Sequence, residues 1–95
     1  MSVAYRLLYH AAVLSEDVPQ LDRRQRRTIQ RAIEERIVQD PIRFGAPLRR
    51  GLYGYRKLRV GDYRIIYEVR GRDIMIYTIG HRREVYTGVA TRLPK

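Results

Sequence analysis

Two glycine-containing dipeptides, Gly61-Asp62 and Gly71-Arg72, constrain the fold of this chain more than any other feature. Glycine supplies the positive φ that a two-residue hairpin turn requires, and both dipeptides are flanked by segments rich in Val, Ile and Tyr. The sequence therefore predicts a three-stranded antiparallel meander, with strands at 52–60, 63–70 and 73–79.

The turns also set the register, because residues pair by counting outward from a two-residue turn. Arg59 is then expected to face Arg64, and the same count from the second turn places Arg64 opposite Ile79. Because side chains alternate along a strand, one face is expected to be apolar and to hold Leu58, Val60, Tyr63, Ile65, Tyr67, Val69, Ile74, Ile76 and Thr78. The other face, called here the basic face, is expected to hold Tyr55, Lys57, Arg59, Arg64, Ile66, Glu68, Met75, Tyr77 and Ile79.

The first half of the chain is expected to supply one strand and two helices. The segment 3–9 alternates weakly and is rich in β-forming residues, and a short helix begins at 10–14 and ends near Pro19. Asp22 is a favourable N-cap for a long arginine-rich helix that stops before Pro41. The apolar stripe of that helix consists of Ile29, Ala32, Ile33 and Ile37.

A Gly- and Pro-containing segment, residues 40–51, is expected to be a loop between this helix and the meander. Helices that bury an apolar stripe must cover the apolar face of the sheet. The expected fold is therefore α+β, with two N-terminal helices packed on one face of a small antiparallel sheet. A chain of 95 residues forms one domain, over residues 1–95.

The charge balance points to a polyanionic partner. Twenty Lys and Arg against ten Asp and Glu give a net charge of +10, which attracts phosphate polymers. Only Lys57 and Lys95 are lysines, so eighteen of the twenty cations are arginine. Arginine grips phosphate bidentately and stacks on bases, although a GC-rich genome would also raise its share.

Several function classes are excluded or disfavoured by what the sequence contains. There is no cysteine, which excludes disulfides and thiolate metal sites. Carboxylates are scattered rather than paired, and no phosphate-binding GKS or GKT loop occurs, so neither a metal site nor a nucleotide cofactor is predicted. The longest apolar run, 74–79, is too short to span a membrane, and a charge at Arg6 argues against a signal peptide. The expected location is the cytoplasm.

Four residues that could act on RNA follow the third strand: His81, Arg82, Arg83 and Tyr86. The sheet order is expected to bring them to the basic face, beside Arg64. RNA carries its own nucleophile, the 2′-hydroxyl, so cleavage needs positioning, proton transfer and positive charge on the phosphate. Two plainer readings remain. The patch can bind nucleic acid without cleaving it, or Tyr86 and its neighbour can simply dock a C-terminal segment onto the core.

Two stretches resemble a known family. The segment Gly54 to Val69, with the sequence GYRKLRVGDYRIIYEV, resembles the central hairpin of RelE/ParE superfamily toxins. The segment Ile79 to Tyr86, IGHRREVY, resembles their last strand and tail. This resemblance implies the toxin of a type II toxin–antitoxin pair. In RelE-like members it implies cleavage of mRNA in the ribosomal A site, leaving a 2′,3′-cyclic phosphate and a 5′-hydroxyl.

The resemblance also implies residue roles. Arg64 would contact the scissile phosphate, and Arg82 or Arg83 would stabilise charge or protonate the leaving oxygen. Tyr86 would help to activate the 2′-hydroxyl, in competition with His81, because some relatives use a tail histidine. Lys57 would be one of the basic residues on the strand before the turn, where RelE has a second lysine in place of Tyr55. The residues expected to bind RNA are Arg59, Arg83, Tyr55 and Arg56, with the choice between Arg82 and Arg83 for the chemistry left open.

The implied partners are a cognate acidic antitoxin, the ribosome and mRNA, with operator DNA bound only through the antitoxin complex and no membrane. Two other functions are compatible with the residues. A ParE-like toxin would inhibit DNA gyrase and cleave nothing itself, and a basic module would bind nucleic acid without being toxic.

Overall fold

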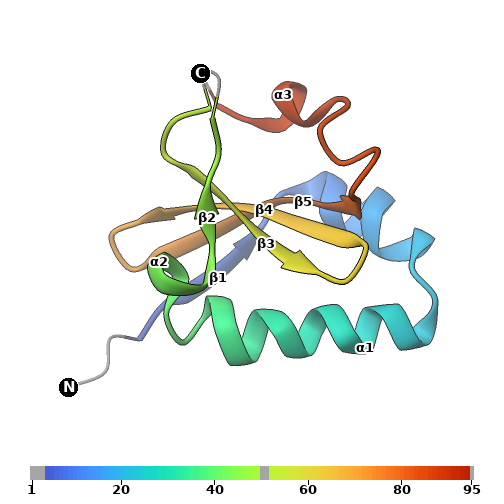
Figure 1. Ribbon diagram of the computed structural model, residues 1–95, viewed down its shortest axis with the longest axis horizontal. Helices are drawn as coiled ribbons and strands as arrows, with labels where there is room; N and C mark the ends of the chain where they lie inside the picture. Colours follow the sequence, from blue (N-terminus) through green and yellow to red (C-terminus); the bar gives the residue numbers. More distant parts are fainter. Residues whose placement is uncertain (1–3, 50–51, 95) are drawn as a thin grey trace.

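Five strands form a single sheet in the computed structural model, which describes residues 4–49 and 52–94 (Figure 1). The strand order is β1-β5-β4-β3-β2. The strands are β1 (Arg6–Tyr9), β2 (Ala46–Pro47), β3 (Tyr55–Val60), β4 (Tyr63–Arg70) and β5 (Asp73–His81). Val3, the first residue of the expected N-terminal strand, and Gly51, in the expected loop, lie outside the described residues.

The predicted meander is confirmed. Strands β3, β4 and β5 pair antiparallel, and Arg59 faces Arg64 as expected. Gly61 and Gly71 both have φ of +59°, the left-handed conformation that favours glycine in such turns.

The expectation of a wholly antiparallel sheet is wrong for β1, which pairs with β5 in parallel. The ladder begins where the Arg6 amide donates to the Arg72 carbonyl at 2.7 Å. The Arg6 guanidinium also binds both carboxylate oxygens of Asp73, at 3.0 and 2.9 Å. Strand direction could not be predicted here because local alternation is the same in both directions; the route of the chain through the helices decides it.

The two expected helical regions are present on one side of the sheet, where α1 runs beneath the strands (Figure 1). The first consists of the helical turns η1 (Val13–Asp17) and η2 (Val18–Gln20). The second consists of α1 (Arg23–Ala32) and the wider turns of η3 (Ile33–Ile37). Asp22 caps α1 as predicted, because its carboxylate accepts from the Gln25 amide at 2.7 Å.

The apolar stripe of the long helix is buried as predicted, and it builds the helix-side core together with the sheet. This core consists of Val13, Leu21, Ile29, Ala32, Ile33, Ile37, Leu58, Ile65, Tyr67, Ile74, Ile76 and Ile79. Each fully buried isoleucine contributes roughly 1.5–3 kcal/mol, so this layer is the main source of stability.

The segment expected to be a loop contains two short elements. Asp40 caps the helix α2 (Pro41–Phe44) by accepting from the Arg43 amide at 3.2 Å. The two residues of β2 then pair antiparallel with β3. Both elements are too short for a periodic pattern to reveal them.

A second apolar cluster covers part of the basic face, which was expected to be open. This tail-side core consists of Leu48, Ile66, Tyr77, Val85, Val89 and Leu93. It lies under the C-terminal segment, which ends with the helix α3 (Val89–Arg92) on the side of the sheet opposite α1 (Figure 1). The sequence left open the possibility that Tyr86 and its neighbour Val85 only dock the C-terminal segment onto the core. For Val85 the structure shows such docking, because its side chain is buried in the tail-side core.

The predicted sides of β5 are correct up to Tyr77 and wrong beyond it. Tyr67 pairs with Ile76 and Ile66 with Thr78, so Tyr77 is an extra residue in a β-bulge. The bulge shifts the alternation by one residue. Arg64 consequently faces Gly80 rather than Ile79, and Ile79 rather than Thr78 joins the helix-side core.

Candidate functional site

Three cations share the part of the basic face that the tail leaves uncovered: Lys57 and Arg59 on β3, and Arg64 on β4. Arg59 and Arg64 are direct cross-strand partners. Like charges in this position repel one another, and no ion pair within residues 4–49 and 52–94 neutralises these three. The uncompensated charge therefore creates a local site for an anion.

The tail brings Tyr86 to this group. After β5 the chain turns sharply, since the amides of Glu84 and Val85 both donate to the His81 carbonyl, at 2.9 and 2.8 Å. Val85 then packs closely on the strand: a Cβ placed on Gly80 would lie 3.4 Å from the Val85 Cβ. Tyr86 remains 43% exposed. The Lys57 ammonium nitrogen lies 5.9 Å from the centroid of its ring, within the range of a cation–π interaction.

Two of the predicted arginines meet at the Gly61-Asp62 turn. The Arg64 guanidinium donates to the carbonyls of Gly61 and Tyr63, both at 2.9 Å. The Arg82 amide donates to the Asp62 carbonyl at 2.7 Å, and its Nε lies 3.7 Å from a carboxylate oxygen of Asp62. That ion pair is exposed and therefore weak, so the Arg82 side chain is available to another anion.

His81 does not join this group. It pairs with Tyr63, on the face that the helices cover, and the two rings make an edge-to-face contact with centroids 6.0 Å apart. The bulge in β5 is the reason, because it reverses the side on which every later residue of the strand projects. The histidine Nδ1 accepts a hydrogen bond from the Arg83 amide at 3.2 Å.

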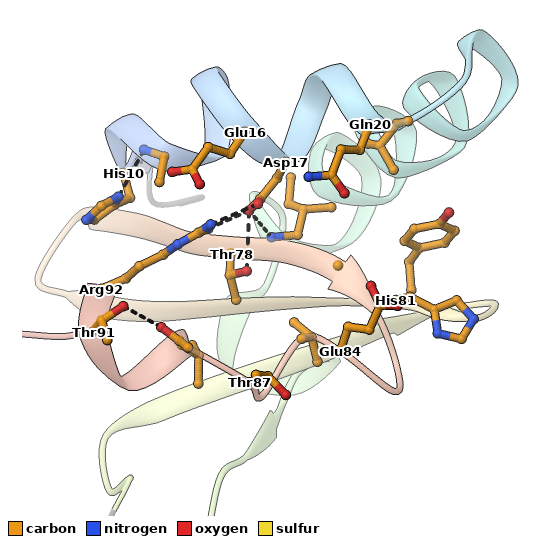
Figure 2. Close-up of a pocket in the computed structure, with 18 residues that line it drawn as sticks. His10, Glu16, Asp17, Gln20, Thr78, His81, Glu84, Thr87, Thr91 and Arg92 are labelled. Carbon is orange, nitrogen blue, oxygen red and sulfur yellow. Dashed lines mark hydrogen bonds and ion pairs between the residues drawn. The ribbon is translucent and has the colours of Figure 1, made fainter.

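His81 instead lies at one end of a cleft of about 570 Å³ between the N-terminal helical turns and the tail (Figure 2). His10 lies at the other end, and Glu16, Gln20 and Glu84 line the walls. Carboxylates, histidines and Arg92 line this cleft together, and Asp17 and Arg92 form an ion pair within it; the basic face, in contrast, presents cations with no ion pair among the described residues.

Arg56 and Tyr55, both expected to contact RNA, make contacts within the protein. The Arg56 guanidinium lies on the helix side, where it donates to the carbonyls of Ile42 and Gly45 at 2.5 and 2.6 Å. The Tyr55 hydroxyl donates to the Pro94 carbonyl at 3.0 Å, and its ring packs edge-on against Tyr77. Arg59 and Arg83 are exposed, so both remain available for contacts with RNA.

The ionisable groups beneath the tail are perturbed. Burial raises the pKa of Tyr77 to about 12, and the hydrogen bond from its hydroxyl to Glu68, 3.0 Å long, adds to the effect. A hydrogen bond to Asp17 raises the pKa of Arg92 above its usual range.

Sequence reasoning missed Asp17 and Arg92, which make the most buried of the ion pairs observed. No local signal pointed to them, because they are 75 residues apart and Arg92 is one of eighteen arginines.

The described part of the chain contains no cluster of three His, Cys, Asp or Glu side chains arranged to bind a metal. None of its helices is long and apolar enough to cross a membrane.

Comparison with known proteins gives a consistent result. Residues 9–86 match the sequence model of a family described as the ParE toxin of the type II toxin-antitoxin system, parDE. Toxin RelG of Mycobacterium tuberculosis is 36% identical over 52 residues, which cover 53% of this chain and 60% of RelG. The match thus spans less than two thirds of that relative.

Two solved structures share the fold. One chain of the toxin-antitoxin complex RelBE2 from Mycobacterium tuberculosis superposes with a TM-score of 0.76 at 26% identity, over 86% of this chain and 95% of the other. YafQ from Escherichia coli superposes with a TM-score of 0.54 at 16% identity, over 83% of this chain and 94% of YafQ. The second likeness extends to the fold alone.

Proposed function

This chain belongs to the ParE toxin family of type II toxin–antitoxin systems, and we propose that it acts as a ribosome-dependent mRNA endoribonuclease. Cleavage would need no metal, since the 2′-hydroxyl of RNA supplies the nucleophile. The observation that carries the proposal is the contact between Lys57 and Tyr86 beside the Arg59–Arg64 pair. A proton-transfer group thus lies next to uncompensated positive charge.

Four residues have a defined task in the proposed reaction. The oxygen of Tyr86 takes the proton of the 2′-hydroxyl and passes its own phenol proton to solvent, and the 2′-oxygen attacks the adjacent phosphorus. Lys57 and Arg64 stabilise the negative charge that develops on the phosphate oxygens. The bond to the 5′-oxygen breaks, and this oxygen takes a proton either from the Arg82 guanidinium, which solvent then reprotonates, or from water while the charge of Arg82 stabilises it. The products are a 2′,3′-cyclic phosphate and a 5′-hydroxyl.

The position of His81 supports Tyr86 as the proton-transfer group. The histidine ring lies against Tyr63 on the opposite face of the sheet, whereas Tyr86 lies on the same face as Lys57. Arg82 is preferred to Arg83 because it reaches the hairpin turn that also binds Arg64.

The proposed partners follow from family and charge. An acidic antitoxin would neutralise the net charge of +10 that the free toxin carries. Ribosome and mRNA would bind through the basic face, and operator DNA only through the antitoxin complex.

The deciding experiment measures cleavage of mRNA on programmed ribosomes by wild type, Arg64→Ala and Arg72→Ala. Arg72 is a matched control, because it is exposed and lies in the other hairpin turn. Loss of a charge stabiliser is expected to slow cleavage by Arg64→Ala roughly a hundredfold to a thousandfold, and Arg72→Ala is expected to match wild type. Equal rates for all three proteins would remove Arg64 from the mechanism.

The description of the matched family, which names parDE, favours a second candidate function, inhibition of DNA gyrase. This activity does not require Tyr86 to lie beside Lys57. Gyrase supercoiling assayed in parallel separates the two functions: intact mRNA together with inhibited gyrase would replace the proposed activity by the second.

A further inference from the structure

One buried ion pair outside the basic face connects three distant parts of the chain (Figure 2). Asp17, at the end of η1, has a side chain that is only 10% exposed. Its carboxylate accepts from the Ile79 amide at 2.9 Å and from the Thr78 hydroxyl at 3.3 Å. It also binds the Arg92 guanidinium through two hydrogen bonds, of 2.6 and 3.0 Å. A single carboxylate thus joins the first helical layer, strand β5 and the tail.

Arg92 is the main polar anchor of the tail. It is the last residue of α3, a helix of four residues that is too short to be stable without tertiary contacts. Its side chain is 17% exposed, and it donates a further hydrogen bond of 3.1 Å to the Tyr77 carbonyl. Removing one partner of a buried pair leaves the other charge without compensation, so α3 would lose this attachment.

Tyr86 lies between the two points that Asp17 holds. Upstream, Asp17 binds the backbone of β5 at Ile79; downstream, it binds Arg92. Between them, Val85 is buried while Tyr86 is exposed and has no hydrogen bond of its own within the described residues. Its place beside Lys57 is set upstream by the turn at His81 and the packing of Val85 on β5, and downstream by the point at which Arg92 is fixed.

We propose that Asp17 and Arg92 are positioning residues, which hold the tail so that Tyr86 lies against Lys57 on the basic face. Neither residue touches the RNA. The inference rests on the proposed ribonuclease function for its catalytic consequence, but the geometric consequence can be measured without it. A misplacement of about 1 Å by a distant mutation can slow an enzyme roughly a hundredfold, which sets the size of the expected effect.

The chain offers a matched control. Arg6 and Asp73 also form a two-hydrogen-bond pair, at 3.0 and 2.9 Å, and they also connect another element to β5. That pair is exposed, with side chains 70% and 38% accessible, and it lies at the first residue of β5, whereas the tail follows the last. Asp73→Asn thus removes a comparable ion pair from a part of β5 that does not hold the tail, so it should leave the position of Tyr86 unchanged.

The test compares wild type, Asp17→Asn, Arg92→Gln, Arg92→Lys and Asp73→Asn in the full-length chain, with two readouts. NMR measures the chemical shifts of the Tyr86 ring and its contacts with the Lys57 side chain. Kinetics on programmed ribosomes separate the cleavage rate at saturation from ribosome affinity. Asp17→Asn and Arg92→Gln are expected to lose the Tyr86–Lys57 contacts and to cleave roughly a hundredfold more slowly, with affinity within about twofold of wild type. Arg92→Lys, which keeps the charge, is expected to recover part of both.

The opposite results would overturn the proposal. Unchanged Tyr86 signals in Asp17→Asn would do so, and so would an equal effect of Asp73→Asn. A parallel loss of rate and affinity would indicate general unfolding rather than positioning. If Asp17→Asn does not fold, Arg92→Lys decides by the same readouts. If wild type cleaves no RNA, the proposed function fails, and the NMR comparison alone decides whether Asp17 positions Tyr86.

Discussion

The ammonium nitrogen of Lys57 lies 5.9 Å from the ring centroid of Tyr86, although 28 residues lie between them. Over that stretch the chain turns three times: in the two hairpin turns and again after β5. The interaction places the phenol hydroxyl and a full positive charge on one surface. We therefore expect the two residues to act on the same phosphodiester.

Tyr86→Phe keeps the ring over Lys57 but removes the hydroxyl. If the hydroxyl assists proton transfer, this variant is expected to cleave mRNA about a hundredfold or more slowly, within the usual contribution of such groups. Rates on programmed ribosomes check this, with thermal unfolding as the control for folding. A variant that cleaves at the wild-type rate would exclude the Tyr86 hydroxyl from the chemistry.

His81→Asn is expected to leave cleavage within about twofold of wild type, since surface changes away from a site alter free energies by about 0.5 kcal/mol or less. Asparagine retains an acceptor for the Arg83 amide, which the histidine Nδ1 binds at 3.2 Å. The same ribosome assay measures the effect. A large loss of rate in a folded His81→Asn protein would mean that the ring reaches the substrate from the other face of the sheet.

Gly45→Ala is expected to destabilise the fold by roughly 1–3 kcal/mol through overpacking. A methyl group there would overlap the Tyr67 hydroxyl, which is fully buried and donates to the Pro41 carbonyl at 2.5 Å. Urea unfolding of the single and double variants with Tyr67→Phe provides a double-mutant cycle. Gly45→Ala should reduce the free energy of unfolding less in Tyr67→Phe than in wild type. An equal reduction in the two proteins would show that the overlap with the hydroxyl is relieved in another way.

Alkaline pH is expected to destabilise the protein through Tyr77. Because burial and Glu68 raise its pKa from 10.0 to about 12, the folded state favours the protonated phenol. The stabilisation is complete below the unfolded pKa and is lost as pH rises from 10.0 towards about 12. Urea unfolding at about pH 9 and about pH 11.5 measures the loss, which should be smaller in Tyr77→Phe.

Tyr53→Phe serves as the control for the alkaline experiment, because that side chain is 81% exposed. It should lose stability with pH just as wild type does. The loss in Tyr77→Phe will not vanish entirely, since burial also raises the pKa of Tyr9 and Tyr67. Identical pH dependence in wild type and Tyr77→Phe would contradict the assignment.

The sequence by itself determined the central hairpin and the long helix. The left-handed turns at Gly61 and Gly71 and the strict alternation around them are local properties, so they predicted the Arg59–Arg64 pairing and the shared face of Lys57 and Arg64. The Asp22 cap and the buried stripe along α1 and η3 were equally local. These features depend on neighbouring residues, whose preferences can be read along the chain.

Only the tertiary structure decided which tail residue lies beside Lys57 and Arg64 on the basic face. An extra residue at Tyr77 places Ile79 in the helix-side core and turns His81 away from the basic face, and the energetic reason lies in packing against distant elements. The Asp17–Arg92 pair likewise joins residues 75 positions apart. Alternation has a period of two, so one inserted residue reverses every later side chain. Nothing local to the strand specifies that insertion, and for this reason the choice between His81 and Tyr86 required the folded chain.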